Sequence, residues 1–359
     1  MSDRLLVGSR KGFFDIRRQR EGWQIAQTAF LGDPISMLLP DSRDGTLFAA
    51  QALGHFGVKL QRSTGDGKSW QEIPTPAFPE VEGDEDGPSV SYLLCLESGG
   101  ADQPGSIWCG TIPGGLFLSR DRGDSWSLNE PLWNAPERKE WFGGGFDAAG
   151  IDSICVDPRD SRHVTLAVSC GGVWVTIDGG ASWQISAAGM FAEYMPPQRR
   201  NEQAIQDVHR LVQCPAAPDT LWAQHHNGAF RSTDGARSWQ EVTAIRPSKF
   251  GFAVAVHPKD PNTAWFVPGV KDECRIPVDA KLVVARTRDG ARSFDVLTQG
   301  LPQSHAYDIV YRHGLAVDGS GARLAMGSTT GHLWVSEDAG DNWTLAAGNL
   351  PPINCVRFG

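Results

Sequence analysis

Several stretches of the sequence combine residues that bind anions with residues that move protons. The segment Lys271–Pro277, with the sequence KDECRIP, places Asp272 and Glu273 beside Arg275. Arginine binds carboxylates through two parallel hydrogen bonds, so we expect Arg275 and Arg312 to bind an anionic group. The alternative is that ion pairs within this segment order its own loop. The residues to which we assign catalytic roles are Glu273, Tyr307, Tyr311, His225, His226, His305 and Asp152.

The segment Gln224–Gly228, with the sequence QHHNG, offers a second kind of chemistry. Neighbouring residues of a strand point to opposite sides, so we expect at most one of His225 and His226 to face a common site. Imidazole and carboxylate groups ligate divalent metals, but no H-x-H or H-x₃-H spacing occurs. Metal ligation, acid–base catalysis and a structural role therefore stay open; we assign no definite cofactor and keep a divalent metal as an alternative. The candidate metal ligands are His209, His225, His226, His305 and His313.

The segment Glu137–Gly145 ends in WFGGG, two aromatic residues followed by three glycines. The glycines are typical of a lid hinge, or of backbone that approaches a ligand closely. Equally, Trp141 and Phe142 could pack the loop onto the fold. No Lys-Ser or Lys-Thr pair follows, so the segment is not a phosphate-binding loop. The residues that we expect to contact substrate are Arg10, Arg275, Arg312, Trp141, Asp272, Gln224 and Tyr194.

Composition limits the classes of partner. The chain has 359 residues, a formal net charge of −9 and a pI near 5.5, with no basic run. Nucleic acid and anionic membranes are therefore not expected partners, and we expect a small-molecule substrate. The charged N-terminal region and the absence of a long apolar run predict a cytoplasmic protein without a transmembrane helix. The seven cysteines lack C-x-x-C spacing and are expected to be reduced thiols.

An acidic run, EVEGDEDG, spans residues 80–87. We expect it to form a solvated loop. A calcium site is the alternative, although the spacing is not that of an EF-hand.

An octapeptide repeats along the chain and reveals the elements that must position these residues. It ends at Trp70, Trp126, Trp183, Trp239, Phe294 and Trp343, which are 49 to 57 residues apart, and a degenerate copy ends at Trp23. Each unit contains four short runs rich in β-branched and aromatic residues, separated by Gly, Pro or Asp. Four strands per unit at this period predict the blades of a β-propeller.

The pattern predicts an all-β fold, with residues 1–359 forming a single seven-bladed propeller of four-stranded antiparallel blades. The first unit has only three strands, and the last unit is followed by an additional run at 353–358. We therefore expect the C-terminal strand to complete blade one and so protect its edge. The expected blades comprise residues 1–30 with 352–359, then 35–76, 89–130, 151–188, 207–244, 251–299 and 312–349.

The repeated pattern S-x-D-x-G-x-S/T-W resembles the Asp-box, or BNR repeat, of sialidase-like propellers. In the segments WFGGG, EYMPP, QHHNG and HAYDIVYRHG, the chain is also similar to bacterial BNR-repeat proteins that are grouped with glycosyl hydrolases. In that class the octapeptide forms the turn between the third and outermost strands of each blade. The resemblance thus implies that the octapeptide is structural and that function lies on the opposite face, where the long irregular loops lie.

Within this resemblance, Arg275-Ile276-Pro277 is similar to the RIP signature of sialidases, whose arginine helps to bind a carboxylate. Sialidases use a tyrosine nucleophile. The resemblance implies that a glutamate would activate this tyrosine. In sialidases, however, this signature lies in the first blade, whereas here it falls in the sixth. We therefore do not expect true sialidase activity.

Our leading interpretation is a hydrolase or lyase that acts on a small polar or anionic substrate, for which a carbohydrate is one candidate, at the central mouth opposite the octapeptides. The alternatives are a metal-dependent propeller enzyme and a non-catalytic platform for binding or assembly. A closed polar pocket at the centre would favour an enzyme, and exposed apolar patches reaching the rim would favour a platform. The sequence does not indicate the oligomeric state.

Overall fold

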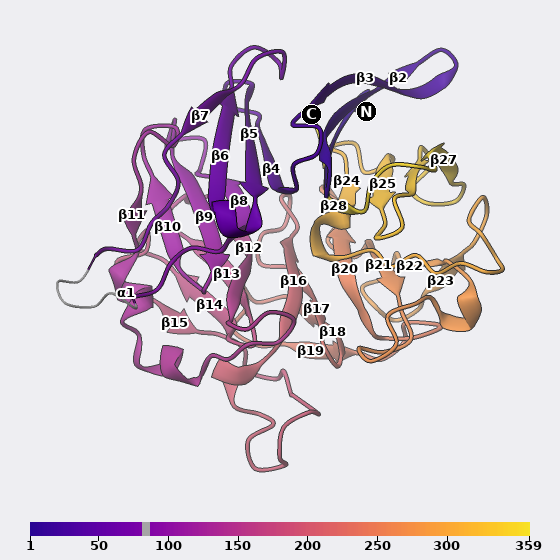
Figure 1. Cartoon of the computed structure of the whole chain (residues 1–359). Coiled ribbons are helices and arrows are strands. Elements are labelled where there is room, and N and C mark those ends of the chain that lie inside the picture. The colour runs from indigo at the N-terminus through magenta and orange to yellow at the C-terminus, as the bar shows by residue number, and fades with distance from the viewer. Residues whose placement is uncertain (81–86) are drawn as a thin grey trace.

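Each repeat unit folds into a sheet of four antiparallel strands, and seven such sheets surround a common axis (Figure 1). The computed structural model describes residues 1–80 and 87–359. The predicted all-β propeller with four-stranded blades is confirmed. The expected acidic loop or calcium site falls mostly on residues 81–86 and so lies outside the described residues.

The first four blades follow one another from the N-terminus. Blade one contains β28 (Ile353–Phe358), β1 (Arg4–Ser9), β2 (Gly12–Gln19) and β3 (Gly22–Ala29). Blade two contains β4 (Ile35–Asp41), β5 (Thr46–Ala52), β6 (Val58–Ser63) and β7 (Gln71–Ile73). Blade three contains β8 (Tyr92–Ser98), β9 (Ile107–Ile112), β10 (Leu116–Ser119) and β11 (Ser127–Leu128). Blade four contains β12 (Gly150–Val156), β13 (Val164–Ser169), β14 (Gly172–Thr176) and β15 (Gln184–Ile185).

Three further blades complete the ring. Blade five contains β16 (Val208–Gln213), β17 (Leu221–His225), β18 (Gly228–Ser232) and β19 (Gln240–Val242). Blade six contains β20 (Gly251–Val256), β21 (Ala264–Pro268), β22 (Val284–Thr287) and β23 (Asp295–Leu297). Blade seven contains β24 (Leu315–Val317), β25 (Leu324–Gly327), β26 (Leu333–Ser336) and β27 (Thr344–Ala347).

The core lies between neighbouring blades. Inner strands such as β13 and β20 are buried along their whole length, because each sheet packs against another sheet on both faces. Strands in this situation are apolar nearly throughout rather than alternating, as the sequence runs show. Trp108, Trp174, Trp222 and Trp265 are almost fully buried in these inter-blade layers.

The octapeptides form the turns between the third and fourth strands, as predicted. In blade three, Ser119 Oγ accepts a hydrogen bond from the Gly123 N–H at 2.8 Å, and Asp121 Oδ1 accepts one from the Ser125 N–H at 2.9 Å. The Trp126 indole N–H then donates to Pro74 O, which follows the outer strand of the preceding blade. Comparable bonds link Trp183 and Trp239 to the blades before them. The octapeptide therefore fixes these turns, and in blades three, four and five its tryptophan also ties adjacent blades together.

Blade one differs at this turn. The predicted degenerate copy before Trp23 is a tight hairpin in which only Arg20 and Glu21 separate β2 from β3. Trp23 nevertheless lies at the beginning of the outer strand, as the repeat predicts.

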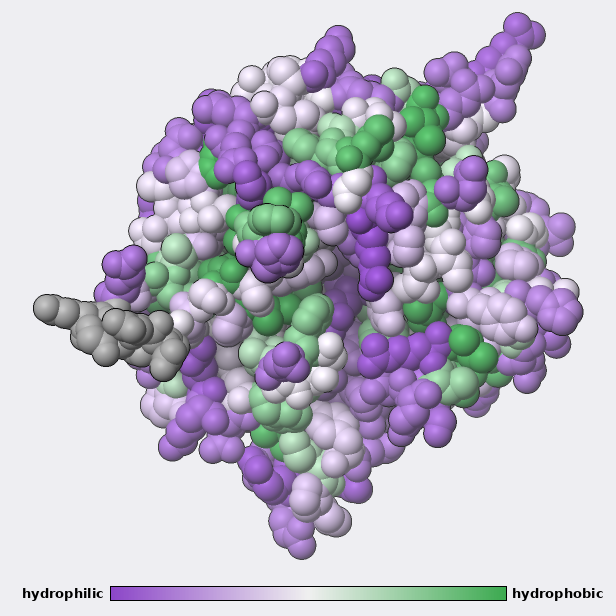
Figure 2. Space-filling model, in the orientation of Figure 1, coloured by the Kyte–Doolittle hydropathy of each residue, from purple (hydrophilic) through white to green (hydrophobic). Residues whose placement is uncertain are grey.

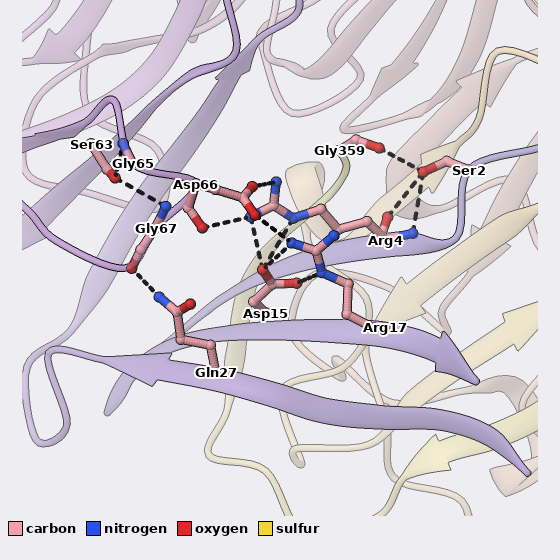
Figure 3. Close-up of polar contacts among 10 residues, drawn as sticks. All are labelled: Ser2, Arg4, Asp15, Arg17, Gln27, Ser63, Gly65, Asp66, Gly67 and Gly359. Atoms are coloured by element: carbon pink, nitrogen blue, oxygen red, sulfur yellow. Dashed lines mark hydrogen bonds and ion pairs between the residues drawn. The ribbon is translucent and has the colours of Figure 1, made fainter.

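Blade one also closes the ring. The C-terminal strand β28 pairs with β1, with Val356 opposite Val7, so the predicted closure is confirmed. The copy of the octapeptide in blade two has Gly65 where most copies have aspartate, and its Asp66 instead binds Arg4 and Arg17 of blade one (Figure 3). These arginines also share the buried carboxylate of Asp15. Blades one and two are thus joined by ion pairs beside the two termini.

Short helices occur on one face of the ring. They are η1 (Gly54–Phe56), α1 (Glu130–Trp133), η2 (Pro136–Glu140), η3 (Gln203–Ile205), η4 (Val278–Ala280) and η5 (Arg312–Gly314). All lie in loops between second and third strands or in connections between blades, on the face opposite the octapeptides. None of these described helices has the length and apolar character needed to cross a membrane.

Candidate functional site

A cavity of about 550 Å³ opens at the centre of the face opposite the octapeptides. Figure 2 shows the corresponding hollow near the middle of the ring, with hydrophilic surface along its wall. Loops and inner strands from blades one to seven contribute to its lining. The predicted site residues that line it are Arg10, Tyr194, His209, His226, Asp272, Arg275, Tyr311, Arg312 and His313.

One wall carries a cluster formed by Asp207, His209 and His226. Asp207 immediately precedes β16, His209 lies two residues further on the same side, and His226 follows β17. Asp207 Oδ2 lies 3.4 Å from His209 Nε2 and 3.4 Å from His226 Nδ1. Burial alone would raise the pKa of Asp207, but the neighbouring histidines hold it well below its usual value. The cluster therefore presents an ionised carboxylate to the cavity.

Arg275 lies at the mouth and is held in place from two sides. Its Nη2 donates to Asp272 Oδ1 at 2.7 Å, and its guanidinium lies over the Phe252 ring at 5.3 Å. Its Nη1 lies 3.5 Å from the Tyr311 hydroxyl. The ion pair with Asp272 therefore orders the loop, and Arg275 also lines the cavity, while binding of an anion by Arg275 stays a prediction.

Arg10 and Arg312 approach the same cavity from blades one and seven. Among residues 1–80 and 87–359, neither forms an ion pair with a carboxylate. With Arg275 they give the cavity three guanidinium groups, which favours an anionic ligand.

Buried polar groups lie beneath the cavity. His313 Nε2 lies 2.8 Å from Asp152 O, and its Nδ1 lies 2.9 Å from Arg357 Nη2. Both ring nitrogens are therefore engaged, so His313 lines the cavity without a free atom for a metal. Asp152 is fully buried, does not line the cavity, and burial raises the pKa of its carboxyl to about 8.

Aromatic side chains cover much of the remaining wall. Phe142, Phe146, Phe252, Tyr92 and Tyr311 line the cavity together with Tyr194. The Tyr194 hydroxyl donates to Ile205 O at 2.8 Å. Burial raises the pKa of Tyr92 to about 12 and raises that of Tyr194 further, so both phenols stay protonated at neutral pH.

The QHHNG segment separates its two histidines, as strand alternation predicts. His226 faces the cavity, whereas His225 is buried within blade five. His225 Nε2 lies 3.2 Å from Gln206 Oε1, and its Nδ1 accepts from the Asn227 N–H. Gln224 is likewise buried and donates to Gly228 O and Lys249 O. His225 and Gln224 therefore organise the loop and do not reach a ligand in the cavity.

Four other predicted residues lie outside the cavity. The Glu273 side chain is 76% exposed and pairs with Lys271. Tyr307 is 55% exposed, and His305, also exposed, does not line the cavity. Trp141 packs edge-on against Trp174 at 5.7 Å, beneath its own loop. The pairing of a tyrosine with Glu273 that a sialidase-like site implies is therefore not assembled in the cavity.

Sequence reasoning missed several residues that line the cavity. The most important is Asp207. It could have been predicted from its position two residues before His209, because residues i and i+2 of a strand share one side. The others include Phe142, Phe146, Phe252 and Asn354. Their sequence context resembles ordinary core or loop positions, so nothing local distinguishes them.

Comparison with known proteins gives weak similarity to xyloglucanases. No family model matches the chain, so membership of the Asp-box sialidase-like family is not confirmed. The chain is 27% identical over 163 residues to a xyloglucanase from Hypocrea jecorina, covering 42% of this chain. It is 24% identical over 287 residues to a probable oligoxyloglucan-reducing end-specific xyloglucanase from Neosartorya fischeri, covering 72% of this chain. The matches span only 19% and 32% of those relatives.

Solved structures share the fold. The GH74 xyloglucanase from Xanthomonas campestris aligns with a TM-score of 0.68 at 15% identity, covering 96% of this chain and 53% of that one. YCF48 bound to D1 peptide aligns with a TM-score of 0.54 at 13% identity, covering 87% of this chain and 82% of that one. At such identities these similarities show the propeller fold alone.

Proposed function

We propose that the protein is a hydrolase or lyase that acts on a small anionic, carbohydrate-like substrate in the central cavity. The observation that carries this proposal is the convergence of Arg10, Arg275 and Arg312, from three blades, on one cavity with aromatic walls. Guanidinium groups bind carboxylates, and aromatic faces pack against the apolar face of a sugar ring. The weak similarity to xyloglucanases supports a carbohydrate as the substrate class.

Within this proposal, Arg275 binds the carboxylate of the substrate. Asp272 and Phe252 fix the direction of its guanidinium before the substrate arrives, so little side-chain entropy is lost on binding. Tyr311 lies beside Arg275 and exchanges a proton with the substrate. Asp152 has no direct contact with substrate in this arrangement, because it lies beneath the cavity.

Calorimetry with sugar acids tests this assignment. Glucuronate, galacturonate and N-acetylneuraminate should bind, whereas glucose and xylose should bind weakly or not at all. Arg275→Ala should weaken sugar-acid binding by about 10- to 100-fold, the range expected when a hydrogen bond to a charged group is lost. Lys271→Ala is the matched control, because Lys271 lies in the same loop but does not line the cavity. Equal binding by R275A and wild type, or no binding by any sugar acid, would overturn the proposal.

Product analysis tests the reaction class. Incubation with nitrophenyl glucuronides should release nitrophenol and glucuronate, and incubation with oligogalacturonides should release a shorter saccharide, whereas neutral xyloglucan oligosaccharides should stay intact. Addition of water indicates a hydrolase, whereas an unsaturated sugar indicates a lyase.

A binding platform is the second candidate function. The structural similarity to YCF48 bound to D1 peptide favours it, as does the exposure of Leu31 and Phe56, at 69% and 73%, on the same face as the cavity. Binding of extended peptides together with a silent sugar-acid panel would support this candidate over the enzyme.

A further inference from the structure

Asp207, His209 and His226 present three ligand atoms of the kinds that bind transition metals. These atoms, Asp207 Oδ2, His209 Nε2 and His226 Nδ1, all lie within 4.8 Å of one another. They come from two adjacent strand ends of blade five and line the central cavity. Two imidazoles and one carboxylate form a common set of protein ligands for a metal that keeps an open position.

The hydrogen bond on the far side of His209 determines what faces the carboxylate. His209 Nδ1 lies 2.8 Å from Gly251 O, and a carbonyl oxygen can only accept, so Nδ1 carries the proton. In the neutral ring, Nε2 then directs its lone pair toward Asp207 Oδ2, which is also an acceptor. Two acceptors facing each other require either a second proton on the ring or a cation between them.

The distances fit a cation held between these groups. A charged imidazole–carboxylate hydrogen bond is about 2.7–2.9 Å long. The Asp308–His332 pair of this same protein has a contact of that length, with 2.8 Å between Oδ1 and Nδ1. Asp207 Oδ2 instead lies 3.4 Å from each of two imidazole nitrogens. Ligands of a tetrahedral zinc ion, with bonds of about 2.0–2.1 Å, are separated by about 3.3 Å.

The surrounding contacts fix the three ligands in place. The His209 ring stacks on Phe252 at 4.5 Å, and Asp207 Oδ1 accepts from Ser169 Oγ at 2.9 Å. The His226 N–H donates to Asp207 O, which holds the second imidazole against the carboxylate. Hydrogen bonds and packing of this kind orient the side chains that bind the metal in established metal sites.

We infer that Asp207, His209 and His226 bind a divalent transition metal, with zinc as the best fit, and leave a coordination position open to the cavity. A metal there would receive an anionic oxygen of the substrate beside Arg275, or would activate water. That use of the metal rests on the proposed function, whereas metal binding itself does not.

Metal titration tests the inference directly. Tag-free protein, stripped with a chelator, is titrated with Zn²⁺ in competition with a chromophoric chelator, and the metal content of fresh protein is measured by mass spectrometry. We expect one zinc per chain with a Kd of about 1 μM or tighter. Asp207→Asn retains the Oδ1 acceptor but loses the ligand at Oδ2, and should weaken binding by on the order of 100-fold, as should His226→Gln.

His332→Gln is the matched control, because it alters the ordinary Asp308–His332 pair on the same face and should leave zinc binding unchanged. Thermal unfolding of each chelator-stripped variant verifies that it is folded. Absence of zinc binding by folded wild type, or equal binding by wild type, D207N and H226Q, would overturn the inference. Zinc binding without any response to sugar acids would support the metal site and refute the proposed substrate class. Sugar-acid binding without zinc binding would refute only the metal site.

Discussion

Gly143 and Gly144 set how closely one loop approaches the cavity wall. A Cβ atom on Gly144 would lie 2.7 Å from Cys170 Sγ and 3.6 Å from Asp207 Oδ2, and one on Gly143 would lie 2.4 Å from Phe146 O. A Cβ on Gly145 would meet nothing within 4 Å. The first two glycines therefore allow close packing against protein atoms, whereas approach of the WFGGG backbone to a ligand stays a prediction. The two aromatic residues of this segment have different environments, because Trp141 packs under the loop while Phe142 lines the cavity.

Asp152 gives a prediction at the same scale. Burial raises the pKa of its carboxyl from 3.8 to about 8, although Arg312, Ser153 and Arg210 oppose the shift. The folded protein therefore binds a proton that the unfolded chain has lost above about pH 4. This contribution is complete below the unfolded pKa and is lost as the pH rises toward the folded pKa, by up to about 1.4 kcal/mol per pH unit. Asp152→Asn keeps the shape and removes the titration.

The stability of D152N relative to wild type should therefore improve as the pH rises from about 5 to 8. Chemical denaturation at each pH measures this difference. Glu273→Gln, at a carboxylate with 76% side-chain exposure, should show no such trend. A constant difference between D152N and wild type across this range would contradict the assigned pKa.

Individual site residues were predictable only where the sequence carried an unusual chemical pattern. KDECRIP and QHHNG indicated Arg275, Asp272 and His226, which line the cavity. The same reasoning selected Glu273 and His225, which do not, because side-chain direction in a loop depends on contacts that are distant in sequence. His225 is turned inward by its bond with Gln206, nineteen residues earlier in the chain.

At the scale of the element, the octapeptide turn stabilises each blade through a buried hydroxyl. Ser119 is 1% exposed, and its Oγ accepts from the Gly123 N–H while donating to Asp121. Ser119→Ala leaves that N–H without a partner, so the free energy of unfolding should fall by about 1–3 kcal/mol. Denaturant unfolding of the variant measures the loss.

A conservative substitution provides the control for this turn. Thr176 and Thr287 occupy the corresponding position in blades four and six and accept equivalent N–H bonds at 3.0 Å. Ser119→Thr should therefore be nearly neutral. Equal stability of S119A and S119T would show that the hydroxyl has no role in the turn. Both variants should bind ligand as the wild type does, because the turn faces away from the cavity.

The strands were predictable because the residue composition of each run and the period of the repeat both indicate four strands per unit. The apolar runs at 152–156, 164–168, 173–176 and 182–185, for example, correspond to β12 to β15 within two residues at each boundary. The turn of blade one was harder to predict, because its two-residue hairpin lacks the serine or threonine and the aspartate that mark most of the other turns.

At the scale of the whole molecule, the repeat predicts the number of blades but not which loops meet over the axis. Asp207 and His226 belong to one blade, whereas Arg10, Arg275 and Arg312 come from three others. Their separation depends on how far each loop leans over the mouth, and the repeat carries no information about that. The repeat therefore predicts the face on which the site lies, and the structure is needed to define its members.

Closure of the ring gives the last prediction. Ile353, Cys355 and Val356 of β28 are buried, and the strand pairs with β1 along its length. Burial of three such side chains contributes about 1.5–3 kcal/mol each, which is comparable to the 5–15 kcal/mol that separates most folded domains from the unfolded state. Deletion of residues 353–359 should therefore abolish cooperative unfolding and expose the edge of β1 to aggregation.

A circular permutant separates this effect from the mere position of the chain end. Ser2 Oγ donates to Gly359 O at 2.6 Å, so a short linker can join the termini without displacing β28 (Figure 3). New termini at the exposed Arg20–Glu21 hairpin would keep every strand of blade one. The permutant should unfold cooperatively at nearly the wild-type temperature and remain monodisperse by size-exclusion chromatography, whereas the truncated chain should not. A truncated chain as stable as the permutant would show that the ring does not need β28, and that β1 alone can close the propeller.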